Sequence, residues 1–310
     1  MLASPSSSNL QTTSPPAVVP QSSRWLWYPL ETNLTLGNQI LLRVLLCTLS
    51  FTVGIGYSDR NPEPVVESAI AAPLLPGQLV AQLPTEPLPQ APPPPTVRIK
   101  AVGDMVLGTN YPGNRLPTPP ETLFRAVIPL LQGADLVFGN FESTLTNATV
   151  PSKDTSRPNV FAFRTPPSYS QFLRAAGFQV LNIANNHALD FGRQGFGDTA
   201  AAIEQQGMQV VGRKDDIVYS TLEDGLTVAW VGFTYGTQLN SIQALGSAQS
   251  LVSTAQANAD MVVVSFHGGA EGTSAMRTRN QTEYFFGENR GNVVAFSRAL
   301  INTGADLVLG

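Results

Sequence analysis

The stretch from Phe178 to Gly192 reads Phe-Gln-Val-Leu-Asn-Ile-Ala-Asn-Asn-His-Ala-Leu-Asp-Phe-Gly. It combines an apolar run with a polar loop, the pattern on which the fold prediction rests. Residues 178–183 form a short apolar run that predicts a buried strand, and a polar loop follows at once. A helix is predicted next, over residues 195–206. Functional side chains of α/β proteins gather where strands end. The stretch therefore predicts an α/β fold with a site in this loop.

The same alternation of strand and helix extends in both directions from this stretch. The turn Glu223-Asp224-Gly225 separates two apolar runs and predicts a hairpin. Together these segments predict a layered α/β domain over residues 97–310. Further strands are expected at 97–102, 135–138, 217–222, 226–233, 261–266 and 306–309, and helices at 121–128, 168–176 and 292–303.

Proline is unevenly distributed along the 310 residues: eleven of 25 fall between Pro62 and Thr96, and none follows Pro167. Residues 1–35 are rich in Ser, Thr and Pro, and we expect them to be disordered. Residues 58–96 predict a semi-rigid, proline-rich linker. The N-terminal third is therefore expected to lie outside the folded domain.

Residues 36–57 are the most apolar part of the chain, interrupted by Arg43. The length suits either a cleaved signal peptide or a signal anchor, and a buried core helix is the weaker alternative. Arg24 and Arg43 lie towards the N-terminal side of this segment, whereas Arg60 alone lies just beyond its C-terminal end. The positive-inside rule therefore predicts a membrane-anchored or exported protein with its domain outside the cytoplasm.

Charge and cysteine content exclude several classes of protein. The net charge is −4, and residues 97–310 contain 15 Lys and Arg against 17 Asp and Glu, so no nucleic-acid partner is expected. The single cysteine, Cys47, excludes an intrachain disulfide framework and a cysteine-rich zinc site.

Four predicted strands end in side chains that commonly bind metals. The chain has two histidines, His187 and His267, and both follow apolar strands in loops rich in Gly and Asn. Each residue also has an ordinary structural explanation: a hydrogen-bonding histidine, a helix N-cap for Asp104 and a solvated loop carboxylate for Glu142. Their common position at strand ends favours a divalent cation site for Mn, Fe or Zn.

These residues lie in motifs that resemble the CapA family of poly-γ-glutamate capsule biosynthesis proteins, over roughly residues 97–310. The resemblance implies an α/β/β/α sandwich similar to calcineurin-like metallophosphoesterases. The Asn-Asn-His-x-x-Asp-x-Gly segment is the most specific motif. The motifs are Gly103-Asp104, Asn140-Phe141-Glu142, the 182–192 segment, His267-Gly268-Gly269 with Glu271, and the 304–310 segment.

The resemblance also implies a role for each of these residues. Asp104 would bind one metal ion, His267 a second, and Glu142 would bridge them. Asn186 would be a further ligand, and His187 a general acid or transition-state stabiliser. The supporting residues would be Asn140, Asn185, Asp190 and Glu271.

Two features depart from the family pattern. Val106 stands where many metallophosphoesterases have a histidine, and the chain ends at Gly310, where the family continues into a Gly-His-x-Pro-His loop. We therefore expect a C-terminally incomplete domain that is inactive in this form.

The expected function is that of a membrane-tethered, extracytoplasmic protein of capsule or cell-envelope polymer biosynthesis, with metal-dependent hydrolase character. Its expected partners are membrane polymer-synthase subunits and an anionic polymer or phosphoester substrate. The alternative is a non-catalytic assembly subunit of a membrane polymer synthase.

Overall fold

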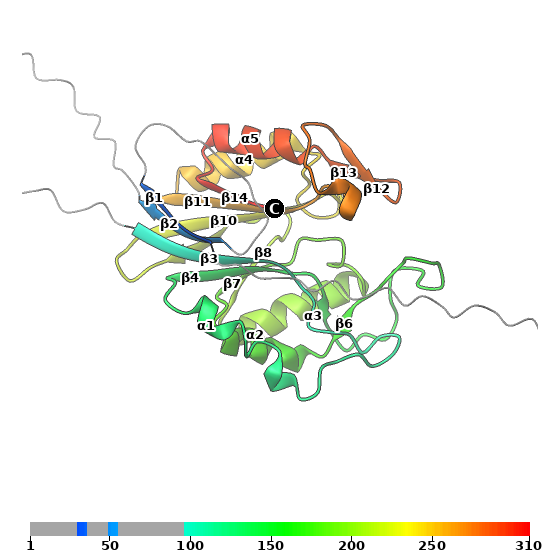
Figure 1. The fold of residues 1–310 in the computed structure, drawn as a ribbon. Helices are drawn as coiled ribbons and strands as arrows, with labels where there is room; N and C mark the ends of the chain where they lie inside the picture. The colour runs from blue at the N-terminus through cyan, green and yellow to red at the C-terminus, as the bar shows by residue number, and fades with distance from the viewer. Residues whose placement is uncertain (1–29, 36–48, 55–95) are drawn as a thin grey trace, which may run out of the picture.

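A computed structural model describes residues 30–35, 49–54 and 96–310. Two β-sheets lie face to face between two layers of helices, which gives the order α/β/β/α (Figure 1). The predicted α/β/β/α sandwich is therefore confirmed.

The first sheet has the strand order β1-β2-β3-β4-β7-β8. From β3 to β8 the neighbouring strands are parallel, whereas β2 runs antiparallel to β3. The strands are β1 (Leu30–Thr35), β2 (Leu49–Gly54), β3 (Thr96–Met105), β4 (Leu136–Phe141), β7 (Val180–Asn182) and β8 (Gln209–Val211).

The second sheet has the order β14-β11-β10-β9, with the predicted hairpin formed by β9 and β10. Its strands are β9 (Val218–Thr221), β10 (Thr227–Thr234), β11 (Met261–His267) and β14 (Leu307–Leu309). Two small sheets lie in the loops, made by β5 (Thr144–Leu145) with β6 (Arg164–Thr165) and β12 (Glu283–Phe285) with β13 (Glu288–Gly291).

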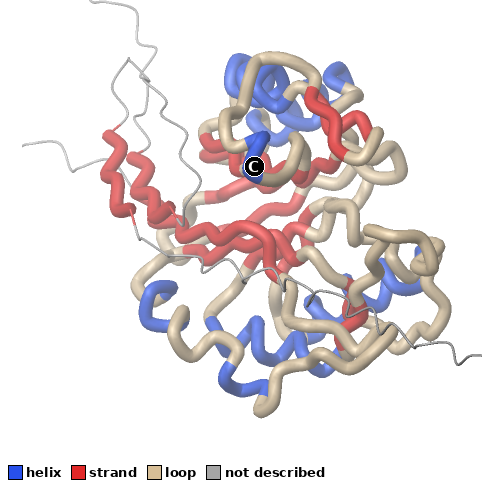
Figure 2. The backbone as a smooth tube through the Cα atoms, turned by 45° about the vertical axis from the view of Figure 1, so that its right-hand side comes forward, coloured by secondary structure: helices blue, strands red, loops and turns tan. Residues whose placement is uncertain are grey.

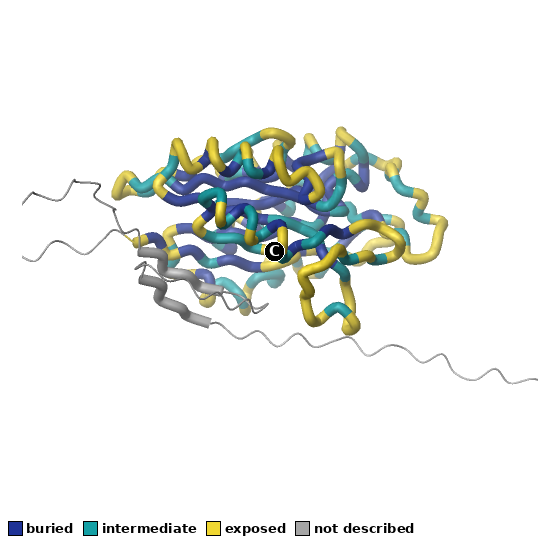
Figure 3. Tube along the Cα trace, turned by 90° about the horizontal axis from the view of Figure 1, so that it is seen from above, coloured by how far each residue is buried: buried dark blue, intermediate teal, exposed yellow. Residues whose placement is uncertain are grey.

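Helices cover the outer face of each sheet, as Figure 2 also shows. The first sheet carries α1 (Ile128–Leu131), α2 (Ser170–Ala176) and α3 (Gly192–Gln205). The second carries α4 (Leu245–Gln256) and α5 (Val293–Thr303). The central strands are consequently the most deeply buried part of the molecule (Figure 3).

The two sheets are joined by an apolar core of their own. Phe138 of β4 stacks on Trp230 of β10, with ring centroids 5.3 Å apart and an interplanar angle of 4°. Both side chains are almost completely buried, at 2% and 1% exposed. This contact is part of the apolar cluster that packs one sheet against the other.

Most predicted elements are present, but one predicted helix is wrong. Residues 121–128 form a single 3₁₀ turn at Pro120–Thr122 and then irregular turns, and α1 begins only at Ile128. Pro129 is compatible with the first turn of a helix but not with its interior. Helix α4 and strand β8 were not predicted.

Most of the predicted disordered, apolar and linker segments lies outside the described residues. The parts that are described, β1 and β2, are strands, and β2 pairs with β3 from Leu49 to Gly54. Within the described ranges, no helix is both long enough and apolar enough to cross a membrane. Strands β1 and β2 depart from the expectation that this third of the chain lies outside the folded domain, whereas the interpretation of the undescribed residues before Thr96 stays a prediction.

Candidate metal centre

Three charged side chains from three strand ends meet at one edge of the sandwich. Asp104 lies near the end of β3, Glu142 directly follows β4, and His267 is the last residue of β11. One ligand atom from each lies within 4.8 Å of the other two. Because β3 and β4 belong to one sheet and β11 to the other, the cluster spans both sheets.

The cluster is open on one side and buried on the other. His267 Nδ1 is 3.5 Å from Asp104 Oδ1, and His267 Nε2 is 3.7 Å from Glu142 Oε1. The Asp104 side chain is 54% exposed, against 15% for Glu142 and 11% for His267. A small ligand would therefore approach from the side of Asp104.

A network of asparagine side chains holds Asp104 in place. Asn140 Nδ2 donates to Asp104 Oδ1 at 2.6 Å. Asn140 Oδ1 in turn accepts from Asn182 at 3.0 Å and from Asn185 at 3.2 Å. The predicted supporting residues Asn140 and Asn185 thus link the 185–190 loop to the carboxylate.

His187 also lies close to Glu142, with its Nε2 3.9 Å from Glu142 Oε1. Its other nitrogen, Nδ1, is 2.8 Å from Oδ2 of Asp190, whose side chain is fully buried. Phe163 stacks on the imidazole ring at a centroid distance of 4.3 Å. The ring is therefore held on one nitrogen and one face, while Nε2 is directed at the site.

The predicted ligand Asn186 has a buried Oδ1 that receives no hydrogen bond from the described residues. An unpaired buried carbonyl oxygen is costly, and a cation would satisfy it. Carboxylate, imidazole and amide oxygen together suit a borderline or hard divalent metal. The donor set fits the expected cofactor.

The charges of the cluster affect one another strongly. Burial, with the negative charge of Asp104, raises the pKa of Glu142 from 4.5 to about 7. Burial works to lower the pKa of His267, but Asp104 and Glu142 hold it above its usual value. Partial burial works to raise the pKa of Asp104, yet its contacts with His267 and Asn140 keep it below the usual range. A bound cation would relieve the repulsion between the carboxylates.

Glu271, predicted as a supporting residue, does not join the three-residue cluster. Its Oε1 accepts from Nη1 of Arg290 at 2.8 Å. Arg290 is 4% exposed and also pairs with Glu288 at 2.9 Å, with its guanidinium 4.1 Å from the Tyr235 ring centroid. Sequence reasoning missed Arg290, because nothing local distinguishes a buried arginine from a solvated one.

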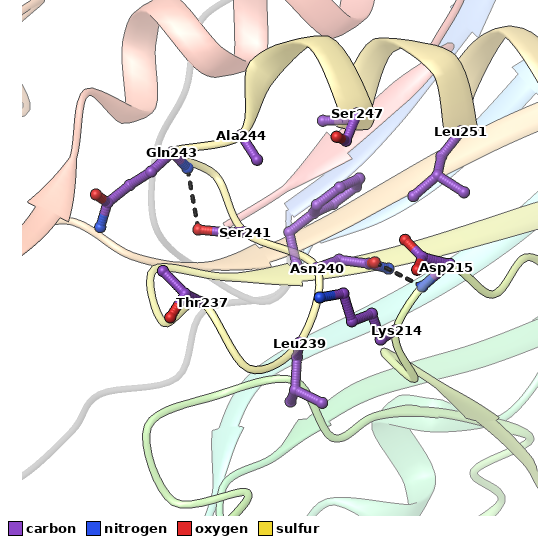
Figure 4. Close-up of a pocket in the computed structure, with 12 residues that line it drawn as sticks. Lys214, Asp215, Thr237, Leu239, Asn240, Ser241, Gln243, Ala244, Ser247 and Leu251 are labelled. Carbon is purple, nitrogen blue, oxygen red and sulfur yellow. Dashed lines mark hydrogen bonds between the residues drawn. The ribbon is translucent and has the colours of Figure 1, made fainter.

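A separate cavity of about 250 Å³ lies where β10 leads into α4 (Figure 4). Lys214, Leu239 and Ser247 are among its lining residues, and Asn240 accepts from the backbone of Asp215 at 2.8 Å. None of the residues predicted for the site lines this cavity. It adjoins the sandwich at a position distinct from the metal cluster.

The family model and the similar curated proteins agree on one family, that of capsule synthesis proteins. Residues 98–310 match the family model described as "Bacterial capsule synthesis protein PGA_cap". A Bacillus subtilis protein named "PGA biosynthesis protein CapA" is 28% identical over 229 residues, covering 67% of this chain and 55% of that protein. The Bacillus anthracis "Capsule biosynthesis protein CapA" is 29% identical over 231 residues, covering 67% and 52%.

This chain thus spans about half the length of the curated relatives it matches. The family match covers most of the chain and includes each residue of the metal cluster. The predicted resemblance is confirmed, and the chain belongs to the bacterial capsule synthesis protein PGA_cap family.

Proposed function

We propose that this protein acts in the biosynthesis of a capsule or cell-envelope polymer of the poly-γ-glutamate type, with metal-dependent hydrolase activity. Two kinds of evidence support the proposal: membership of the PGA_cap family, and the names of the Bacillus relatives. The single observation that carries the hydrolase part is the cluster of Asp104, Glu142 and His267 with His187 beside it.

In this proposal Asp104, Glu142 and His267, with the unpaired oxygen of Asn186, hold one divalent cation. The cation supplies Lewis-acid stabilisation of negative charge at a phosphoryl or acyl oxygen. The remaining work belongs to the chain itself. Asn140 holds the Asp104 carboxylate at 2.6 Å, so that one oxygen keeps a fixed direction.

His187 is the proposed proton carrier. Asp190 binds Nδ1 at 2.8 Å, and this contact fixes the ring and leaves Nε2 facing the site. Nε2 can then hold a proton for the leaving group or stabilise the charge that develops there. Phe163 covers one face of the ring and limits the access of water to it.

Turnover of bis(p-nitrophenyl) phosphate by a protein completed at its C-terminus with the Gly-His-x-Pro-His loop, with and without Mn²⁺, tests the hydrolase proposal. We expect Mn²⁺-dependent release of nitrophenol in the wild type and none in His187→Ala. Glu223→Gln is the matched control, since Glu223 is exposed and makes no hydrogen bond or ion pair among the described residues. A protein that binds Mn²⁺ but shows no turnover would overturn the hydrolase proposal and favour the assembly-subunit alternative.

The proposed place of action is outside the cytoplasm, on a membrane tether. The support is the apolar segment 36–57, with Arg24 before it and Arg43 in its N-terminal half. Membrane polymer-synthase subunits and an anionic polymer are the proposed partners. A reporter that works only in the cytoplasm, fused after Gly310, should stay inactive, and strong reporter activity would refute export.

A further inference from the structure

Residues 151–163 lie against the outside of the loop that carries Asn186 and His187. Ser152 N donates to the carbonyl oxygen of Asp190 at 2.8 Å, and Phe163 stacks on the His187 ring at 4.3 Å. Ser152 and Phe163 lie outside the sequence motifs, whereas their partners Asp190 and His187 lie within them. The segment therefore contacts the loop at both His187 and Asp190.

Lys153 makes the most specific contacts of this segment. Its Nζ lies 2.6 Å from Asp190 Oδ1, 2.9 Å from the carbonyl oxygen of Asn186 and 3.4 Å from that of Phe161. The ammonium group donates hydrogen bonds to the two carbonyl oxygens and forms an ion pair with Asp190 Oδ1. Two of the three oxygens belong to residues of the candidate site.

Asp190 depends on this lysine. Its side chain is fully buried, and its Oδ2 already binds Phe163 N at 2.6 Å and His187 Nδ1 at 2.8 Å. Oδ1 receives no regular hydrogen bond among the described residues, and its one ion-pair partner there is Lys153. A buried carboxylate that loses its cation is strongly destabilised.

We propose that Lys153 is a positioning residue of the metal centre. By holding Asp190 and the backbone of Asn186 with one ammonium group, Lys153 fixes two orientations: that of the His187 ring and that of the Asn186 amide. This inference rests on the proposed function where it concerns the metal. The part that concerns the His187 ring rests on geometry alone.

Lys153→Met removes the ammonium and keeps much of the aliphatic stem. Lys100→Met is the matched control, because Lys100 Nζ also donates to two backbone carbonyls, those of Leu130 at 2.7 Å and Gln132 at 2.6 Å. Neither of those carbonyls belongs to the candidate site. The two substitutions therefore delete the same chemical group in different surroundings.

The chain has only two histidines, so an imidazole NMR spectrum of the metal-free protein contains two sets of ring signals. In Lys153→Met we expect the His187 Nδ1–H signal to shift or broaden, while the His267 signals stay in place. We also expect about 10- to 100-fold weaker Mn²⁺ binding, the usual effect of losing a residue that orients metal ligands. Lys100→Met should change neither readout.

A folded Lys153→Met protein with wild-type His187 signals and wild-type Mn²⁺ affinity would overturn the proposal. If Lys153→Met does not fold, Lys153→Cys in a Cys47→Ser background can be aminoethylated to restore an ammonium at nearly the same reach. Recovery of the His187 signal on aminoethylation supports the proposal, and a folded product without that recovery refutes it. A wild type that binds no Mn²⁺ would refute the metal function, while the histidine signals would still decide the role of Lys153.

Discussion

Glu142→Gln should stabilise the metal-free protein at alkaline pH. The raised pKa of Glu142, about 7 instead of 4.5, corresponds to about 3 kcal/mol of folding free energy lost when the side chain is ionised. The folded state binds this proton more tightly than the unfolded state, so the contribution is fully present below pH 4.5 and is lost as the pH rises through about 7. Glutamine carries no charge and escapes this loss.

Urea unfolding in EDTA at pH 4.5 and at pH 8 measures the effect. We expect Glu142→Gln to be close to the wild type at pH 4.5 and more stable by up to about 3 kcal/mol at pH 8. The exposed Glu223→Gln should leave the pH dependence unchanged. Mn²⁺ should reverse the order at pH 8, because the wild type gains binding energy from the cation and the variant has lost a ligand.

The reasoning fails if metal-free Glu142→Gln is no more stable than the wild type at pH 8. It also fails if Mn²⁺ stabilises both proteins equally. The first result would mean that neither burial nor the negative charge of Asp104 disfavours an ionised Glu142 in the folded state. The second would mean that Glu142 is not a ligand.

Three further predictions concern the ligands and the core. Asp104→Ala and His267→Ala should each weaken Mn²⁺ binding by at least about 10-fold, measured by calorimetry, whereas His187→Ala should keep the metal and lose hydrolysis. Trp230→Ala should cost about 3–5 kcal/mol in urea unfolding, because it empties the contact between the sheets. Gly232→Ala should cost about 1–3 kcal/mol, since a Cβ there would lie 2.8 Å from the Gly212 Cα.

The sequence predicted those residues of the candidate site that lie at the ends of strands. Asp104, Glu142 and His267 each follow an apolar run, and parallel strands of one layer present their carboxyl ends at the same edge. The structure brings these three side chains together, and their roles as ligands stay predictions. These positions can be predicted because a strand and its end are recognised from neighbouring residues in the sequence.

Contacts made across the chain were not accessible to sequence reasoning. Lys153 reaches Asp190 across 37 residues, and Arg290 reaches Glu271 across a loop and a hairpin. Helix α4 was missed for a different reason: Leu245–Gln256 is rich in Ser, Ala and Gln and has few large apolar side chains. Its helical state depends on packing against β10 and β11 more than on its own pattern.

The candidate metal centre is connected to the packing between the sheets. Gly232 of the second sheet approaches Gly212 and the Asn182 side chain so closely that no Cβ fits between them. Asn182 then donates to Asn140 at 3.0 Å, and Asn140 donates to Asp104 at 2.6 Å. A continuous series of contacts thus runs from the interface between the sheets to a ligand. We therefore expect a substitution beneath the site, such as Gly232→Ala, to change Mn²⁺ affinity without touching any candidate ligand.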